Sequence, residues 1–95
     1  MRTIEVACGK DAAGWTCHVS VSEGASRTDH RVRVDRATLR RLAPGATDPG
    51  ELVRASFDFL LAREPKESIL GAFDLPLIGR YFPEYEAEMV RLAGA

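Results

Sequence analysis

The fold is decided by residues 15–21, which read Trp-Thr-Cys-His-Val-Ser-Val. Apolar and polar residues alternate strictly in this stretch, and a period of two is typical of a β-strand with one face in a hydrophobic core. The same alternation occurs on both sides of it, in residues 3–8 and 28–34. Polar segments that contain glycine separate the three stretches, as expected for tight turns. We therefore expect three antiparallel strands between about residues 3 and 34.

The side-chain parity of the first two strands restricts how they pair. Inward residues are even-numbered on the first strand and odd-numbered on the second, so the numbers of two directly opposed residues must add up to an odd value. Cys8 is therefore expected opposite Cys17 or one inward position away. These two are the only cysteines of the chain. We predict two reduced thiols that pack as small hydrophobic side chains, and a cross-strand redox pair is the alternative that this geometry allows.

The rest of the chain has helical periodicity. The apolar stripe of residues 53–61 is so wide that it predicts a central helix lying across the sheet, with Phe57 and Leu60 among the most buried residues. Helix starts are recognised by acidic caps and by proline in the first turn. Such starts are found at Asp35, Asp48, Pro65, Asp74 and Pro83. The pattern indicates an α+β fold, in which a three-stranded antiparallel sheet is followed by a helical C-terminal half packed on one face.

Length and composition favour one compact domain. The 95 residues are 45% hydrophobic and 28% charged, which is in the range of globular chains. We expect a single domain over residues 1–95, with strands at about 3–34 and helices at about 36–92. No apolar run approaches the roughly 20 residues of a membrane span, and residues 1–5 lack the apolar core of a signal peptide. We therefore predict a cytoplasmic protein without membrane contact.

The C-terminal half resembles the closing segment of a family of small bacterial proteins that have no assigned function. The resemblance is carried by the letters ESIL at residues 67–70, FDL at 73–75, Ile78, and RYFPEYE at 80–86. It implies a bacterial cytoplasmic protein. It offers no catalytic residue that could be carried over to this chain.

Motifs for catalysis, metal binding and cofactors are missing from the sequence. The two histidines, His18 and His30, lie on predicted strands without the spacing of metal ligands, so we interpret them as a surface histidine and a partly buried one. No serine lies in a nucleophile elbow, and no phosphate loop or dinucleotide fingerprint occurs. We expect no metal and no cofactor, and we favour a non-catalytic role, with an enzyme as the third alternative.

Six arginines within residues 27–41 form the strongest charge feature. Residues 27–47 carry a net charge of +4, whereas residues 48–95 carry −4. Rows of guanidinium groups suit phosphates and carboxylates. The favoured interpretation is a solvated face that protects a sheet edge. A nucleic-acid interface is the alternative, and no aromatic residue on this face could stack on bases. The candidate contact residues are Arg31, Arg33, Arg36 and Arg40.

An aromatic cluster around Pro83 is the second candidate surface. It consists of Tyr81, Phe82 and Tyr85. These side chains either anchor the last helix to the core or form a docking patch, because aromatic residues are enriched in both environments.

We predict a non-catalytic interaction module that associates with itself, most simply as a homodimer, and that could also bind another protein partner. A nucleic-acid-associated accessory protein is the alternative function.

Overall fold

The computed structural model describes residues 1–94 and contains a four-stranded sheet in the order β1-β2-β3-β4. Strands β1 (Arg2–Lys10), β2 (Gly14–Glu23) and β3 (Ser26–Asp35) form the antiparallel part of the sheet. This confirms the three predicted strands. Cys8 pairs directly with Cys17, so the odd sums predicted for the β1–β2 register are also confirmed.

The fourth strand corrects the prediction of three. Strand β4 (Ala72–Asp74) pairs parallel to β3, with Phe73 opposite Val32. Asp74 was expected to cap a helix, but it makes no capping hydrogen bond and instead pairs with Arg33, with 2.7 Å between Oδ1 and Nε. The strand was not predicted because three residues are too few to show the alternation of apolar and polar side chains.

Helical segments make up most of the remaining chain. These are α1 (Arg36–Leu42), α2 (Gly50–Leu61), the 3-10 helices η1 (Lys66–Ser68) and η2 (Leu75–Leu77), α3 (Ile78–Tyr81) and α4 (Tyr85–Ala93). Asp35 caps α1 as predicted, because its Oδ1 accepts a hydrogen bond from the Thr38 amide at 2.7 Å. Asp48 accepts one from the Gly50 amide at 2.9 Å, so it supports the first turn of α2 from outside that helix.

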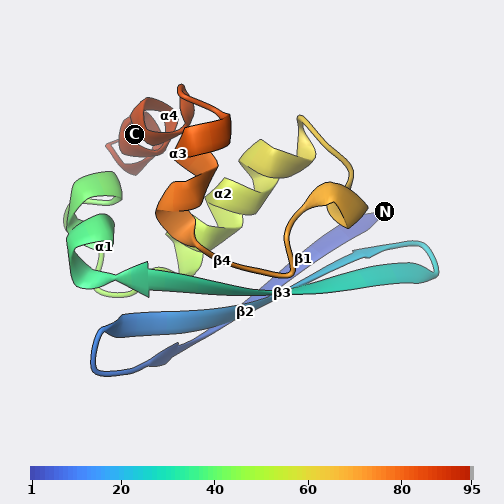
Figure 1. The fold of residues 1–95 in the computed structure, drawn as a ribbon, viewed down its shortest axis with the longest axis horizontal. Coiled ribbons are helices and arrows are strands. Elements are labelled where there is room, and N and C mark those ends of the chain that lie inside the picture. Colours follow the sequence, from blue (N-terminus) through green and yellow to red (C-terminus); the bar gives the residue numbers. More distant parts are fainter. Residues whose placement is uncertain (95) are drawn as a thin grey trace.

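All helices lie on one face of the sheet (Figure 1). The core lies between the two layers and includes the inward valines of β2 and β3 together with the apolar stripe of α2. Phe57 and Leu60 are buried, as predicted, with Phe57 completely inaccessible. None of the helices described here is long and apolar enough to cross a membrane.

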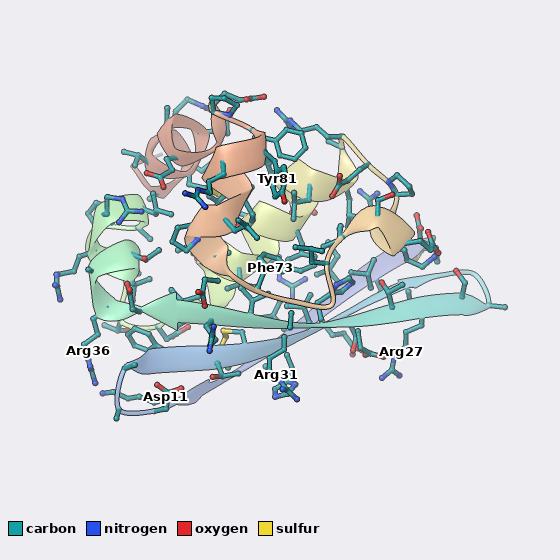
Figure 2. The ribbon with its side chains drawn as sticks, in the orientation of Figure 1. Asp11, Arg27, Arg31, Arg36, Phe73 and Tyr81 are labelled. Atoms are coloured by element: carbon teal, nitrogen blue, oxygen red, sulfur yellow. A yellow bond between two sulfur atoms is a disulfide. The ribbon has the colours of Figure 1, made fainter. Side chains whose placement is uncertain are left out.

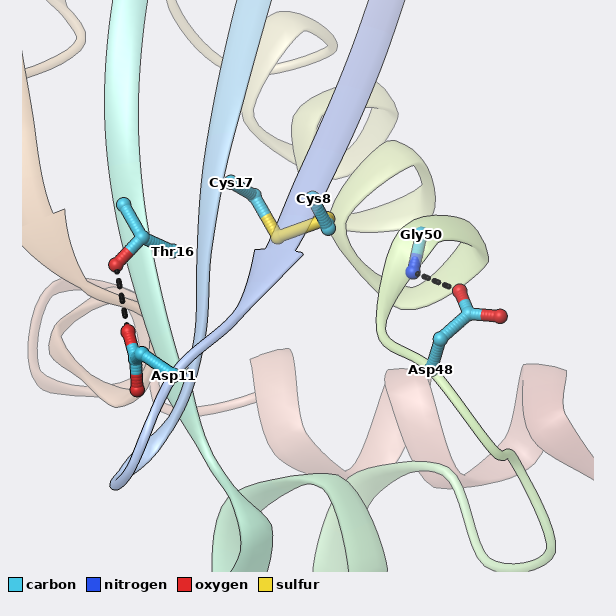
Figure 3. Close-up of a disulfide and its surroundings, with 6 residues drawn as sticks. All are labelled: Cys8, Asp11, Thr16, Cys17, Asp48 and Gly50. Atoms are coloured by element: carbon cyan, nitrogen blue, oxygen red, sulfur yellow. Dashed lines mark hydrogen bonds between the residues drawn. A yellow bond between two sulfur atoms is a disulfide. The ribbon is translucent and has the colours of Figure 1, made fainter.

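A disulfide joins Cys8 to Cys17, which makes the predicted reduced thiols wrong (Figure 3). Cys17 is fully buried, whereas Cys8 on β1 is only partly buried. The parity of the two strands had placed these side chains on the same face and in adjacent positions. The expectation of a reducing compartment, rather than the geometry, led to the incorrect redox state.

Strand β1 forms one edge of the sheet, and the short strand β4 forms the other. Along an edge strand, every second residue directs its backbone N–H and C=O groups away from the neighbouring strand. The Ile4 carbonyl is such a group, and Arg54 of α2 donates a hydrogen bond to it from Nη1. This guanidinium covers part of an edge that is otherwise open to another strand.

Candidate functional site

The most apolar groove of the molecule lies on its helical side and is the candidate site. It lies between the end of α2, the segment from η1 to β4, and the segment from η2 to α3, and its volume is about 410 Å³. We call it the Tyr81 groove. Its lining residues are Leu60, Glu64, Ser68, Ile69, Leu70, Phe73, Leu77, Ile78, Tyr81 and Phe82. Figure 2 shows Tyr81 and Phe73 on the helical side of β3.

Strand β4 fixes one wall of the groove to the sheet. The Arg31 amide donates a hydrogen bond to the Gly71 carbonyl at 2.8 Å, just before β4 begins. The buried His30 ring lies beneath the same segment, where its Nδ1 is 2.8 Å from the Leu70 carbonyl oxygen and its Nε2 is 2.9 Å from Thr28 Oγ1. Both ring nitrogens therefore have partners within the fold. The sequence predicted a partly buried histidine here, and the structure buries His30 more deeply, with 4% of the residue exposed.

A buried lysine fixes η1, the neighbouring part of this wall. Only 4% of the Lys66 side chain is exposed. Its Nζ donates to Ser26 Oγ and to the Glu67 carboxylate, and it lies 3.6 Å from Glu23 Oε1. The Glu67 carboxylate raises the pKa of Lys66, so the amine is held in its charged form. The lysine thereby links η1 to the turn between β2 and β3.

The predicted aromatic cluster is divided by the fold. Tyr81 is 67% exposed at the rim of the groove, and Phe82 is half-buried with its ring edge against Phe59, 5.8 Å between centroids. Tyr85 is fully buried, and its hydroxyl is 2.6 Å from Ser56 Oγ. Burial raises the pKa of Tyr85. A partner cannot reach Tyr85 in this fold, so the docking patch predicted for all three is reduced to Tyr81 and Phe82.

The arginines do not line the groove. Arg27 and Arg31 lie on the opposite face of the sheet (Figure 2), and Arg31 stands opposite His18 in the β2–β3 register. Arg36 donates a hydrogen bond to the Ala12 carbonyl at 3.0 Å. Arg40 is exposed on α1. The four predicted contact residues, which include Arg33 of β3, are thus distributed over the outer sheet face and α1.

Intramolecular ion pairs neutralise part of the basic segment. Arg27 pairs with Asp29 at 3.0 Å on the outer face, and Arg33 pairs with Asp74. Arg41 pairs with Glu86 of α4 at 3.0 Å. The last two pairs join the basic segment to the acidic half within one chain. Part of the charge of the basic segment is therefore neutralised inside the molecule. Fewer of its arginines can pair with nucleic acid or with a second copy.

Sequence reasoning missed most of the groove. Leu70 is 50% exposed beside it, and Phe73 packs beneath it at 6.3 Å from the Phe57 ring, as measured between centroids. Residues 71–76, Gly-Ala-Phe-Asp-Leu-Pro, carry a weak signal for this strand. Phe73 lies between a small and a polar neighbour, and the flanking glycine and proline are typical of turns. This pattern is compatible with a very short strand.

Comparison with known proteins gives no further assignment. No protein-family model matches the chain, and neither a curated protein nor a solved structure is similar to it. The relation of the C-terminal half to a bacterial family stays a prediction.

Proposed function

We propose that the chain is a non-catalytic interaction module that associates with a second copy of itself through the Tyr81 groove. The observation that carries this proposal is the position of Tyr81 and Leu70, two large and well-exposed side chains, beside a groove with mostly apolar walls. Single exposed hydrophobic residues are normal on monomers, but a contiguous apolar patch with a cavity is typical of an interface. Tyrosine is also enriched among the residues that dominate binding energies.

The composition of the groove supports binding rather than catalysis. Its polar side chains are Glu64, Ser68 and Tyr81. Among the described residues, no hydrogen bond joins the Ser68 hydroxyl to a carboxylate or an imidazole. Nucleophilic catalysis requires a hydroxyl or thiol activated by an adjacent base. The groove thus has an apolar surface that can bind a partner, and one carboxylate, that of Glu64.

Sedimentation equilibrium on the intact chain tests the proposal. We expect a monomer–dimer equilibrium, and Tyr81→Ala should weaken it at least tenfold. The matched control is Val90→Ala, which removes another exposed apolar side chain from α4, outside the groove. A wild-type protein that stays monomeric up to about 100 μM, where a dimer of roughly −6 kcal/mol would be populated, overturns the proposal. If Tyr81→Ala leaves the dimer dissociation constant unchanged, the chain dimerises through a surface other than the Tyr81 groove.

We also propose a cytoplasmic location from the sequence, and the Cys8–Cys17 disulfide is the observation that weighs against it. Cytosolic glutathione and thioredoxin keep thiols reduced, whereas disulfides persist in oxidising compartments. The Cys8–Cys17 pair therefore tests the location directly. Alkylation of thiols at the moment of lysis, in the cell that makes the protein, should block two cysteines only if the disulfide is reduced there. Two cysteines protected as a disulfide would overturn the cytoplasmic location.

A further inference from the structure

The two cysteines of the disulfide differ in their access to solvent. Cys17 lies on β2, in the interior of the sheet, and none of its surface is exposed. Cys8 lies on β1, at the edge of the sheet, and is only partly buried against the core. Thiol–disulfide exchange requires a thiolate to reach one of the two sulfurs, so access selects the sulfur that is attacked. This difference favours attack on Cys8.

The order of the strands also determines from which side each sulfur can be approached. An attacking thiolate approaches a disulfide sulfur from the side opposite the bond that breaks. The bond crosses from β2 to β1 (Figure 3), so the side of Cys8 that faces away from Cys17 lies beyond the sheet edge. No strand formed by residues 1–94 covers that edge. The corresponding side of Cys17 faces β3, where its register partner Val32 is completely buried.

The side chain that covers part of this edge lies away from Cys8. Arg54 donates its hydrogen bond to the Ile4 carbonyl, and Ile4 precedes Cys8 by four residues, which is about 13 Å along a strand. Gly9 follows Cys8 and has no side chain, and a methyl group added at that position would meet no atom within 4 Å. The edge strand therefore has free space beside Cys8 that a small molecule can enter.

We infer that Cys8 is a modification site for small thiols, and that Cys17 is the cysteine that reverses the modification. The thiolate forms a new sulfur–sulfur bond with Cys8 Sγ while the Cys8–Cys17 bond breaks. The electron pair of that bond leaves with Cys17 Sγ, which then takes up a proton. The exchange therefore needs no oxidant or reductant other than the thiol. Its product carries a mixed disulfide on Cys8 and one thiol on Cys17.

The fold keeps the reverse step available. The Cα atoms of Cys8 and Cys17 are 4.0 Å apart in the paired strands. The Cys17 sulfur therefore stays close to the mixed disulfide as long as β1 remains paired with β2. Once deprotonated, it can attack Cys8 Sγ and expel the small thiol as a thiolate. The site is separate from the Tyr81 groove, because neither cysteine lines that groove.

Mapping the adduct on the intact chain tests which sulfur is attacked. The folded protein is incubated with reduced glutathione, sampled at early times and treated with N-ethylmaleimide, which blocks the released thiol. Lys10 lies between the two cysteines, so trypsin places them in different peptides for mass spectrometry. We expect glutathione on Cys8 with maleimide on Cys17 at least tenfold more often than the reverse. The control is the same reaction in urea, where both sulfurs are exposed and the preference should fall below about twofold.

Three outcomes of the mapping overturn the inference. These are an equal distribution of glutathione over the two cysteines in the folded protein, an excess on Cys17, and no adduct on either cysteine at any time. A preference for Cys8 that persists unchanged in urea also overturns it, because the preference would then come from the local sequence and not from the fold.

Single-cysteine variants measure the same difference in access without the disulfide. Cys17→Ala leaves the Cys8 thiol and Cys8→Ala leaves the Cys17 thiol, and both variants lose the same bond, so they form a matched pair. We expect dithionitrobenzoate, which forms mixed disulfides with thiols, to react with Cys8 at least tenfold faster than with Cys17. Circular dichroism reports whether both variants are folded. Equal rates in two folded variants would overturn the inference, and if either variant is unfolded the mapping on the intact chain decides.

Discussion

Cys8 on β1 and Cys17 on β2 face each other across the sheet with 4.0 Å between their Cα atoms, and a disulfide joins them. The bond ties the edge strand to the centre of the sheet. Because the two residues are separated by only nine positions, it closes a short loop.

Reduction should therefore lower stability by a moderate amount. Chain-entropy arguments for a loop of this size give about 2 to 3 kcal/mol, which we expect dithiothreitol to remove from the free energy of urea unfolding. The variant with both Cys8→Ala and Cys17→Ala should not respond to the reductant. Thiol counting under native conditions should find none. Two reactive thiols in the unreduced protein would contradict the bond.

The centre of the core is Phe57, which contacts the His30 ring at 5.2 Å between centroids. Phe57→Ala should lower the free energy of unfolding by about 3 to 5 kcal/mol, because it removes a fully buried ring and leaves a cavity. Val90→Ala, at an exposed position, should stay within about 0.5 kcal/mol of wild type. A loss below about 1 kcal/mol for Phe57→Ala would mean that the α2–sheet interface is not the centre of the core.

Tyr85 should make the protein sensitive to alkaline pH. Because burial raises its pKa in the folded state, the unfolded chain releases the phenolic proton first, so stability falls as the pH rises above the ordinary tyrosine pKa of 10.0. Tyr85→Phe should cost about 1 kcal/mol at pH 7, through loss of the hydrogen bond to Ser56. Its stability should then fall less steeply than that of wild type above pH 10. Equal slopes in urea unfolding at pH 9 to 11 would contradict this coupling.

Asp35 should have the opposite pH dependence. The hydrogen bond from the Thr38 amide holds the pKa of the Asp35 carboxyl below its ordinary value of 3.8. Its stabilising effect is therefore complete above that value and is lost as the pH falls through the lower folded-state pKa. Asp35→Ala should cost about 1 kcal/mol at pH 7, and the difference from wild type should shrink below about pH 4.

The control for this measurement is Asp58→Ala, which removes an exposed carboxylate of α2 that makes no side-chain hydrogen bond with the described residues. It should change stability by less than about 0.5 kcal/mol. A gap between wild type and Asp35→Ala that stays constant down to pH 2 would show that the carboxylate does not act through its charge.

Local pattern was sufficient for the elements that are long and have one clear face. Strand β2 alternates from Trp15 to Ser22, and α2 shows its apolar stripe through three turns, so both were predictable without any knowledge of their neighbours. Strand β4 was not predictable in this way. Its one inward side chain, Phe73, forms no pattern of its own and can be recognised as part of a strand only from its pairing with β3. A pairing between distant segments leaves no periodicity in either of them.

The candidate site was predictable only in part, for a related reason. Tyr81 and Tyr85 are close in sequence and chemically identical, yet one is at the rim of the groove and the other is in the core. Helical spacing from Tyr85 to Met89 indicated a core position for Tyr85. Nothing local indicated that Leu70 would be left exposed, because its exposure depends on how η1 and β4 pack against α2.

The parallel pairing of β4 with β3 has a consequence for the order of folding. The hairpins β1–β2 and β2–β3 join neighbouring segments, whereas Val32 and Phe73 meet only after the chain between them has closed a large loop. Loop-closure entropy delays such contacts relative to local ones. Strand β4, and with it one wall of the Tyr81 groove, should therefore assemble after the hairpins. A nascent chain would then acquire its contact surface only once its own core has formed, which limits association between incompletely folded copies.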